Sequence, residues 1–176
     1  MLPEQFCVRM KEMLGEEYAA FYASYDLPKY QALRINPLKT ERDTFLLQAP
    51  FSLNRVPWTT NGYYYSGNDQ PGRHPYHEAG VYYIQEPSAM APAEYLMAEP
   101  GERILDLCAA PGGKSTQIAC SMQGEGLIVC NEIHPARAKI LSENIERMGV
   151  CNALVTNETP QKLSDNFREY FDRILV

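Results

Sequence analysis

Asp106-Leu107-Cys108-Ala109-Ala110-Pro111-Gly112-Gly113-Lys114-Ser115 is the stretch of this 176-residue sequence that decides the fold. The segment that leads into it, ERILDLC, predicts a strand, and GKSTQIACSM, which begins at Gly113, predicts a helix. The small residues and paired glycines between them allow the backbone to approach a bound molecule closely. Because a helix N-terminus also offers free N–H groups, a ligand-binding loop is expected at the end of this strand.

Strands alternate with helices from residue 101 to residue 176. GLIVCNE predicts a second strand, HPARAKILSENIERMG a helix closed by Gly149, ALVTN a third strand and DRILV a fourth, which follows a short polar helix. This alternation predicts an α/β fold with a parallel, Rossmann-like sheet. Such a sheet normally continues beyond four strands, so we expect residues 101–176 to be the first half of a domain.

Residues 1–100 predict a small α+β domain with a linker. The hydrophobic periodicity predicts a helix, a strand and a second helix, over residues 3–22, 31–35 and 41–48. The stretch from 54 to 100 is rich in proline and tyrosine, which favours loops and short strands. A helix capped by Ser88 is expected near its end.

The overall composition excludes several classes of protein. The net charge is −6, with 8 basic and 12 acidic residues up to position 100 and 8 and 10 after it, so charge alone does not predict a nucleic-acid partner. No apolar run approaches the roughly 18 residues of a membrane span, and the N-terminus does not resemble a signal peptide. A cytoplasmic protein with no membrane partner is therefore expected.

Cysteines and histidines give no indication of a metal site. The sequence has five cysteines and no C-x-x-C pair, so most are expected to be reduced and buried rather than paired or bound to zinc. His74 and His77 have an H-x-x-H spacing, but Pro75 is expected to prevent a helix there and no other ligand is near. No metal is predicted.

Three kinds of ligand-binding loop compete for the segment after the first strand. A phosphate-binding P-loop fits Gly113-Lys114-Ser115, but Cys108 occupies the position of its first glycine, and the dinucleotide spacing G-x-G-x-x-G is absent. A methyltransferase loop requires an acidic residue at the end of the next strand. Glu132, 26 positions after Asp106, could accept both ribose hydroxyls there, or could instead cap the helix that begins near Pro135.

Three segments, in the same order, resemble the RNA cytosine-5 methyltransferases of the Sun type. DLCAAPGGKSTQIA resembles the first motif of that family, and ALRINPLK (32–39) resembles its Arg-x-Asn segment. HPYHEAGVYYIQEPSAMAPAEYL (74–96) resembles the segment that leads into its catalytic domain. The resemblance runs from about residue 30 to residue 176 and is greatest to the bacterial enzymes that act on small-subunit ribosomal RNA.

The resemblance implies S-adenosylmethionine as the cofactor, with the loop around its methionine part and the acidic residue on its ribose. The implied cofactor-binding residues are Cys108, Ala109, Ala110, Pro111, Gly112, Gly113, Lys114 and Glu132. The family usually places an aspartate near the adenine, at about Thr159 of this chain. Asn157-Glu158-Thr159 stands there instead, so either Asn157 or Glu158 substitutes or the contact is lost.

The resemblance also implies covalent catalysis, in which a thiolate adds to C6 of cytosine and makes C5 nucleophilic. The family's Asp-Ala-Pro-Cys segment and its nucleophilic cysteine follow the strand that DRILV resembles, and this sequence contains neither. Cys108 is interpreted as structural, so no catalytic residue is assigned. Lys114 is an accessory candidate near the target base, or else a solvated lysine in a first helical turn.

The sequence therefore predicts an RNA cytosine-C5 methyltransferase and favours ribosomal RNA as its substrate, given as a fragment that is inactive alone. The alternatives are a noncatalytic module that binds S-adenosylmethionine or RNA, and a P-loop nucleotide binder. Tyrosines 63–65, 82 and 83 either stack on RNA bases or belong to the core. Arg34 and Asn36 either contact RNA phosphates or bridge the two domains, of which residues 1–100 would help to position RNA.

Overall fold

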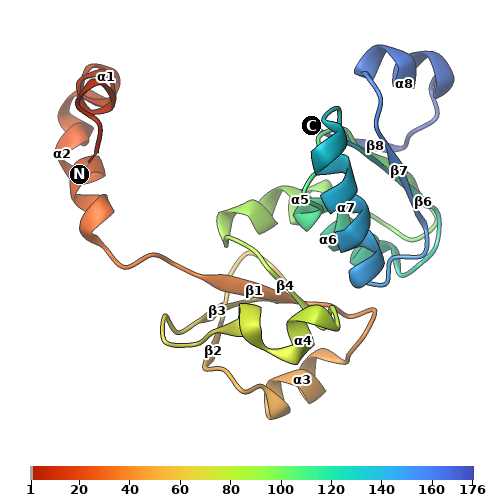
Figure 1. Cartoon of the computed structure of the whole chain (residues 1–176), viewed down its shortest axis with the longest axis horizontal. Helices are drawn as coiled ribbons and strands as arrows, with labels where there is room; N and C mark the ends of the chain where they lie inside the picture. Colours follow the sequence, from red (N-terminus) through yellow and green to blue (C-terminus); the bar gives the residue numbers. More distant parts are fainter. Residues whose placement is uncertain (1) are drawn as a thin grey trace. The chain divides into compact units, whose positions relative to one another are not determined.

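The computed structural model describes residues 2–176, which form two compact units, one reaching to Tyr30 and the other spanning Gln31–Val176 (Figure 1). The first unit consists of α1 (Glu4–Leu14) and α2 (Tyr18–Ala23), with 3₁₀ turns at Gly15–Glu17 and Ser24–Asp26. Three aromatic side chains hold these helices together through ring contacts, namely Phe6, Phe21 and Tyr25.

The helix predicted over residues 3–22 is present but is interrupted at Gly15. Gly15 has φ +53°, and its N–H donates to the Lys11 carbonyl at the end of α1. Glycine adopts positive φ without the steric cost of a Cβ, which makes it a common point of helix termination. The apolar periodicity continues across the break, so periodicity alone predicted one helix.

The second unit begins with an antiparallel sheet in the strand order β2-β3-β1-β4. Its strands are β1 (Ala32–Ile35), β2 (Leu53–Arg55), β3 (Gly62–Tyr65) and β4 (Tyr82–Ile84), and its helices are α3 (Arg42–Gln48) and α4 (Pro75–Glu78), the latter preceded by a 3₁₀ turn at Pro71–Arg73. The core of this sheet is formed by five buried side chains, which are Leu33, Ile35, Phe45, Tyr63 and Tyr82. The strand and helix expected at 31–35 and 41–48 are confirmed.

The α4 helix contradicts the expectation that Pro75 prevents a helix beside His74 and His77. Pro75 is the first residue of α4, a position where the missing N–H of proline is harmless. His74 caps this helix, its Nδ1 accepting a hydrogen bond from the Tyr76 N–H at 3.2 Å. The H-x-x-H spacing thus reflects a helix N-terminus.

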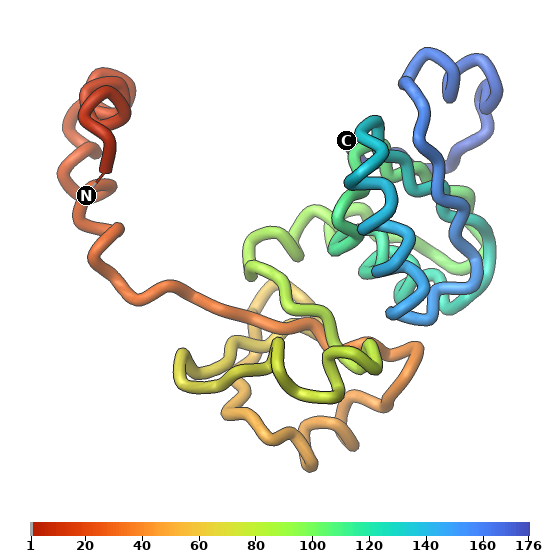
Figure 2. The backbone as a smooth tube through the Cα atoms, in the orientation of Figure 1, coloured from red at the N-terminus to blue at the C-terminus, as the bar shows by residue number. Residues whose placement is uncertain are grey.

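The second sheet is parallel, in the strand order β7-β6-β5-β8. Its strands are β5 (Arg103–Asp106), β6 (Leu127–Asn131), β7 (Ala153–Thr156) and β8 (Arg173–Leu175), and its helices are α5 (Ala91–Leu96), α6 (Gly113–Met122), α7 (Pro135–Arg147) and α8 (Pro160–Asn166). Figure 2 shows the chain passing from β4 through α5 into β5, which links the two sheets. The strands and helices predicted for residues 101–176 are confirmed.

The parallel sheet is covered differently on its two faces. The helices α5, α6 and α7 lie on one face of the sheet (Figure 1), where their side chains pack with Ile104 and Ile128 in one core cluster. Leu163 of α8 packs with Leu105 and Val129 on the other face. The alternating inward and outward residues of β5 and β6 are therefore apolar on both sides, as expected for a parallel sheet.

Ser88 does not cap a helix, contrary to the sequence prediction. Residues Ser88–Met90 form a 3₁₀ turn and α5 begins only at Ala91. The Ser88 hydroxyl donates to the Glu86 carboxylate instead of accepting from a backbone N–H, and this bond lowers the pKa of Glu86. The charged acceptor two residues away is the stronger partner for the hydroxyl.

No helix among residues 2–176 has the length and apolar character to cross a membrane. The antiparallel sheet ends before residue 100 and the parallel sheet begins after it, although both belong to the unit Gln31–Val176. The division into domains 1–100 and 101–176 remains a prediction.

The packing of α7 can be tested with two leucines in helices. Leu141 is fully buried in α7, whereas Leu47 in α3 is 89% exposed. Leu141→Ala should lower the free energy of unfolding by about 2–5 kcal/mol, because it leaves a cavity under the parallel sheet. Leu47→Ala is the control and should change it by less than about 0.5 kcal/mol in the same urea titration. Equal effects would contradict the assigned core.

Candidate functional site

The loop between β5 and α6 is fixed by the strands on both sides of it. The Leu107 N–H donates to the Leu175 carbonyl at 2.9 Å, and the Ala109 N–H donates to the Asn131 carbonyl at 2.8 Å. Gly112 has φ +111°, and a Cβ there would lie 3.3 Å from Leu141. The predicted loop is thus present at the carboxyl ends of the strands, with Gly113 and Lys114 already in the first turn of α6.

A buried carboxylate lies at the start of this loop. Asp106 is the last residue of β5 and is 2% exposed, and its Oδ2 accepts a hydrogen bond from the Ser115 hydroxyl at 2.7 Å. Burial raises the pKa of Asp106, an effect that the Ser115 bond and the charge of Lys114 oppose. Sequence reasoning did not assign this carboxylate a role; an acidic residue directly before a glycine-rich loop was the signal.

Glu132 lies immediately after β6, at the same edge of the sheet, and is 3% exposed. Its Oε1 accepts the His134 N–H at 3.0 Å, just ahead of α7, and its Oε2 lies 3.1 Å from Arg137 Nη1. The bond to His134 precedes α7 and reaches no free N–H of its first turn, so Glu132 does not cap this helix. Arg137 Nη2 also donates to the Ala110 carbonyl at 2.8 Å, so Arg137 links the loop to Glu132, a contact that the sequence did not predict.

The three residues considered for an adenine contact each make a different local bond. Asn157 Nδ2 donates to the Glu132 carbonyl at 2.6 Å. Glu158 forms an exposed ion pair with Lys162 at 2.9 Å, and the Thr159 hydroxyl caps α8. Asn157 is therefore the one attached directly to the backbone of Glu132, and the adenine contact itself remains a prediction.

Lys114 lies on a cavity of about 250 Å³ that separates the loop from the end of β4. Its lining is formed by Tyr83, Ile84, Gln85, Glu86, Ala89, Ala109, Ala110, Pro111, Gly113 and Lys114. The lysine is partly buried in the first turn of α6, a position compatible with both interpretations of it. Its predicted role near a target base is not tested by this placement.

The cysteines differ from the expectation that most of them are buried. Only Cys130 is classed as buried among residues 2–176, and burial raises its pKa to about 12. Cys108 and Cys151 are exposed, and they lie in the loops that follow β5 and precede β7. No group of three or more potential metal ligands occurs in the described part of the chain.

Arg34 and Asn36 bridge the two sheets, the second of the two roles considered for them. Arg34 is 2% exposed and donates from Nη1 to the Gly113 carbonyl at 2.6 Å. Asn36 is fully buried and donates from Nδ2 to the Met148 carbonyl at 2.8 Å. The tyrosines at 63, 82 and 83 are buried and those at 64 and 65 are partly buried, so the core interpretation is confirmed for the first three.

The family models divide the chain in two. Residues 2–87 match the N-terminal domain of the 16S rRNA methyltransferase RsmF, and residues 93–176 match the 16S rRNA methyltransferase RsmB/F. Ribosomal RNA small subunit methyltransferase F from Enterobacter sp. (strain 638) is 36% identical over 99% of this chain and 38% of its own length. The corresponding protein from Citrobacter koseri is 37% identical, over 99% of this chain and 39% of its own length. The chain belongs to the RsmB/F family.

Solved structures share the fold of this RsmB/F chain. A methyltransferase homologue from Pyrococcus horikoshii is 28% identical with a TM-score of 0.85, over 99% of this chain and 58% of that one. NSun6 from the same organism has a TM-score of 0.84 at 19% identity, over 99% of this chain and 70% of the NSun6 chain. The predicted family and Rossmann-like fold are confirmed. The chain spans about two fifths of the length of its curated relatives.

The buried carboxylate of Asp106 gives a pH-dependent prediction. Its pKa is raised by burial, so the folded protein holds this proton more tightly than the unfolded chain, and the fold loses stability as the pH rises through the folded pKa. Asp106→Asn removes this loss and preserves an acceptor for Ser115. The gain in unfolding free energy over the wild type should therefore be larger at about pH 7.5 than at about pH 4.5.

Chemical denaturation at the two pH values measures this difference, with the exposed Asp165→Asn in α8 as the matched control. If Asp106→Asn raises the unfolding free energy equally at both pH values, or lowers it more at the higher pH, the neighbours of the Asp106 carboxylate compensate for its burial and the prediction is wrong.

Proposed function

We propose that this chain is the cofactor-binding part of an S-adenosylmethionine-dependent methyltransferase that acts on C5 of cytosine in small-subunit ribosomal RNA. The observation that carries the proposal is the meeting of a glycine loop and a buried carboxylate, Glu132, at the carboxyl edge of a parallel sheet. Family membership and the NSun6 structure from Pyrococcus horikoshii, which contains the S-adenosylmethionine analogue SFG, support it.

The residues of the loop fit the polar ends of this cofactor. The first turn of α6 has backbone N–H groups without intrahelical acceptors, which suit the methionine carboxylate, and the small residues Ala109 and Ala110 leave room for it. Asp106 and Glu132 place negative charge near a ligand that carries ammonium and sulfonium cations. Glu132 would accept ribose hydroxyls while Arg137 holds its carboxylate in place.

When bound, the cofactor supplies an electrophilic methyl group. The chain's own residues orient it: Gly112 sets the start of α6, and Lys114 presents a cation to the cavity shared with Gln85 and Glu86. That cavity would receive the target cytosine. We extend the proposal to a cytoplasmic protein whose partner is ribosomal RNA, positioned with the help of residues 1–100.

The two alternatives from the sequence differ from this proposal at specific residues. A P-loop nucleotide binder requires glycine where Cys108 stands, and it would bind ATP. A noncatalytic binding module would hold S-adenosylmethionine without turnover, and it is favoured for residues 1–176 by the lining of the Lys114 cavity, which contains no thiol. Calorimetry with S-adenosylmethionine and with ATP separates the P-loop alternative from the other two.

The role of Glu132 can be tested by binding. Glu132→Ala should weaken S-adenosylmethionine binding by more than about tenfold in calorimetry, because hydrogen bonds from hydroxyls to a buried carboxylate are lost. Arg137→Ala leaves the carboxylate but removes the partner that holds it and the bond to Ala110, so a smaller loss than in Glu132→Ala is expected. Unchanged affinity in Glu132→Ala would leave this residue only its structural contacts with His134 and Arg137.

Residues 1–176 alone should not methylate RNA, because C5 of cytosine is a poor nucleophile until a thiolate has added to C6. The test incubates the chain with tritiated S-adenosylmethionine and unmodified small-subunit ribosomal RNA, beside the Enterobacter relative as a positive control. Label in RNA is expected only with the relative. Label transferred by residues 1–176 and abolished by Cys108→Ser would show that Cys108 is the nucleophile.

A further inference from the structure

Arg34 is a buried cation in the middle of β1 that makes no ion pair within residues 2–176. Its guanidinium donates to neutral acceptors, namely Gly113 O, Thr116 Oγ1, Gln85 Oε1 and Gln117 Oε1. Its Nε is buried without an acceptor in the same part of the chain. Burying a charge without a counterion is costly, so these contacts must compensate for a large desolvation penalty.

Two of the contacts lead to the turn that begins α6. Arg34 Nη1 donates to the Gly113 carbonyl at 2.6 Å, and Nη2 donates to the Thr116 hydroxyl at 2.7 Å. The Thr116 hydroxyl in turn donates to the Gly112 carbonyl at 2.7 Å. The guanidinium therefore holds the carbonyls of both glycines, directly at Gly113 and through one hydroxyl at Gly112, where the backbone has positive φ.

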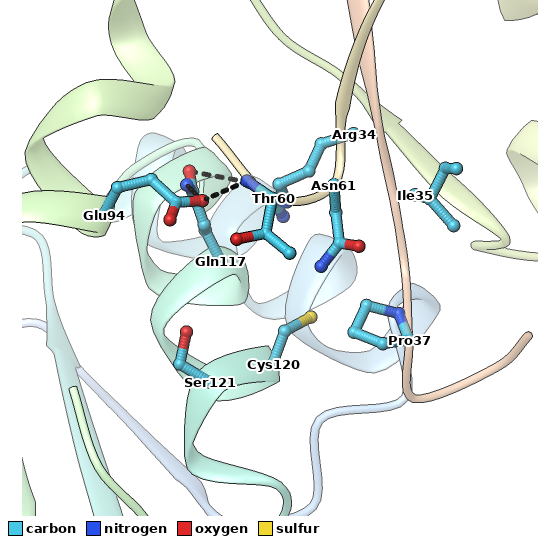
Figure 3. A pocket seen from close by; sticks show the side chains of 9 residues that line it. All are labelled: Arg34, Ile35, Pro37, Thr60, Asn61, Glu94, Gln117, Cys120 and Ser121. Carbon is cyan, nitrogen blue, oxygen red and sulfur yellow. Dashed lines mark hydrogen bonds between the residues drawn. The ribbon is translucent and has the colours of Figure 1, made fainter. Parts of the chain in front are cut away.

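The other neighbours of Arg34 surround its guanidinium with a ring and amide groups, and two of them, Tyr83 and Gln85, also line the Lys114 cavity beside the loop. The ring of Tyr83 lies 5.5 Å from the guanidinium carbon. Figure 3 shows Arg34 on a polar pocket of about 140 Å³, together with Gln117 and Cys120 of α6. Glu94, on the same pocket, accepts from Gln117 Nε2 at 3.1 Å, which fixes the orientation of the amide that faces Arg34.

Asn36, two residues further along the same segment, bonds a different helix end. Its Nδ2 donates to the carbonyls of Met148, just after α7, and Gly80. None of its side-chain hydrogen bonds reaches residues 107–113, although its Oδ1 accepts from Cys120 in the later part of α6. Arg34 and Asn36 are thus equally buried bridges between the sheets, of which one alone reaches the glycine turn.

We propose that Arg34 is a positioning residue for the cofactor loop, which acts by fixing the carbonyls of Gly112 and Gly113 so that the N–H groups of the first turn of α6 point toward the ligand. The inference rests on the proposed function, because it gives this turn the task of binding S-adenosylmethionine. Arg34 contacts neither the cofactor nor the target base in this role.

The test compares Arg34→Gln, Arg34→Lys and Asn36→Ala in the full chain by two measurements. Without cofactor, amide hydrogen exchange in Arg34→Gln should become faster by on the order of tenfold at Gly112 and Thr116, relative to Met148 and Gly149. Asn36→Ala should show the opposite pattern, with faster exchange at Met148 and Gly149. Loss of a merely structural bridge would accelerate exchange similarly in both regions.

Calorimetry with S-adenosylmethionine gives the second readout. Arg34→Gln should bind about tenfold more weakly than the wild type, and Asn36→Ala should remain within about threefold. Arg34→Lys keeps the charge but lacks the forked donors of the guanidinium, so an intermediate affinity is expected; it also provides the comparison if Arg34→Gln does not fold.

The outcomes separate this inference from the proposed function. If the wild type binds and the Arg34 and Asn36 variants lose affinity in equal proportion, Arg34 is only a structural bridge and the inference is overturned. Unchanged exchange at Gly112 in an Arg34 variant overturns it as well. If the wild type does not bind S-adenosylmethionine, the proposed function fails, and the inference fails with it even when the exchange pattern is as expected.

Discussion

The site depends on Asn131, the last residue of β6, and on the hydrogen bonds that converge on it. Its carbonyl accepts the Ala109 N–H, and its Nδ2 donates to the carbonyls of Leu107 and Glu158. Its Oδ1 accepts from the Glu158 N–H and from the Thr156 hydroxyl. One buried amide thereby joins the ends of β5, β6 and β7, so the loop, Glu132 and the segment after β7 cannot move independently.

Sequence periodicity was sufficient for the parallel sheet, because the strands β5 and β6 are largely buried and the helices α6 and α7 each bury an apolar face. The α6 helix begins and ends where the pattern GKSTQIACSM predicts. Periodicity did not predict where α1 ends, because the positive φ of the single residue Gly15 determines that point. The expected Ser88 cap was also wrong, because the Ser88 hydroxyl bonds the Glu86 carboxylate instead of a backbone N–H. These choices depend on small energy differences that a repeat pattern does not contain.

The sequence predicted which residues meet at the edge of the parallel sheet, but it did not predict the contacts between them. The cluster at the sheet edge follows from topology, since consecutive parallel strands end on the same side. The partner of Glu132 depends on how far Arg137 reaches back from α7, and the acceptors of Arg34 are 79 or more residues away in the sequence, except for Gln85 at 51. An arginine within the apolar strand ALRI was the available signal, and it was consistent with RNA contact as much as with burial.

The positions of individual basic side chains in the structure, rather than the net charge of the chain, indicate what these side chains do. A net charge of −6 provides no general attraction for RNA phosphates. Two of the basic side chains, Arg34 and Lys39, bind backbone carbonyls of the protein itself. The guanidinium of Arg34 donates to the Gly113 carbonyl and, through the Thr116 hydroxyl, is linked to the Gly112 carbonyl. The ammonium of Lys39 donates to the carbonyls of Ala79 and of Arg147, the last residue of α7. The segment from Arg34 to Lys39 therefore holds the beginning of α6 and the end of α7 together. Because both helices flank the loop between β5 and α6, the antiparallel sheet helps to hold the candidate site in place.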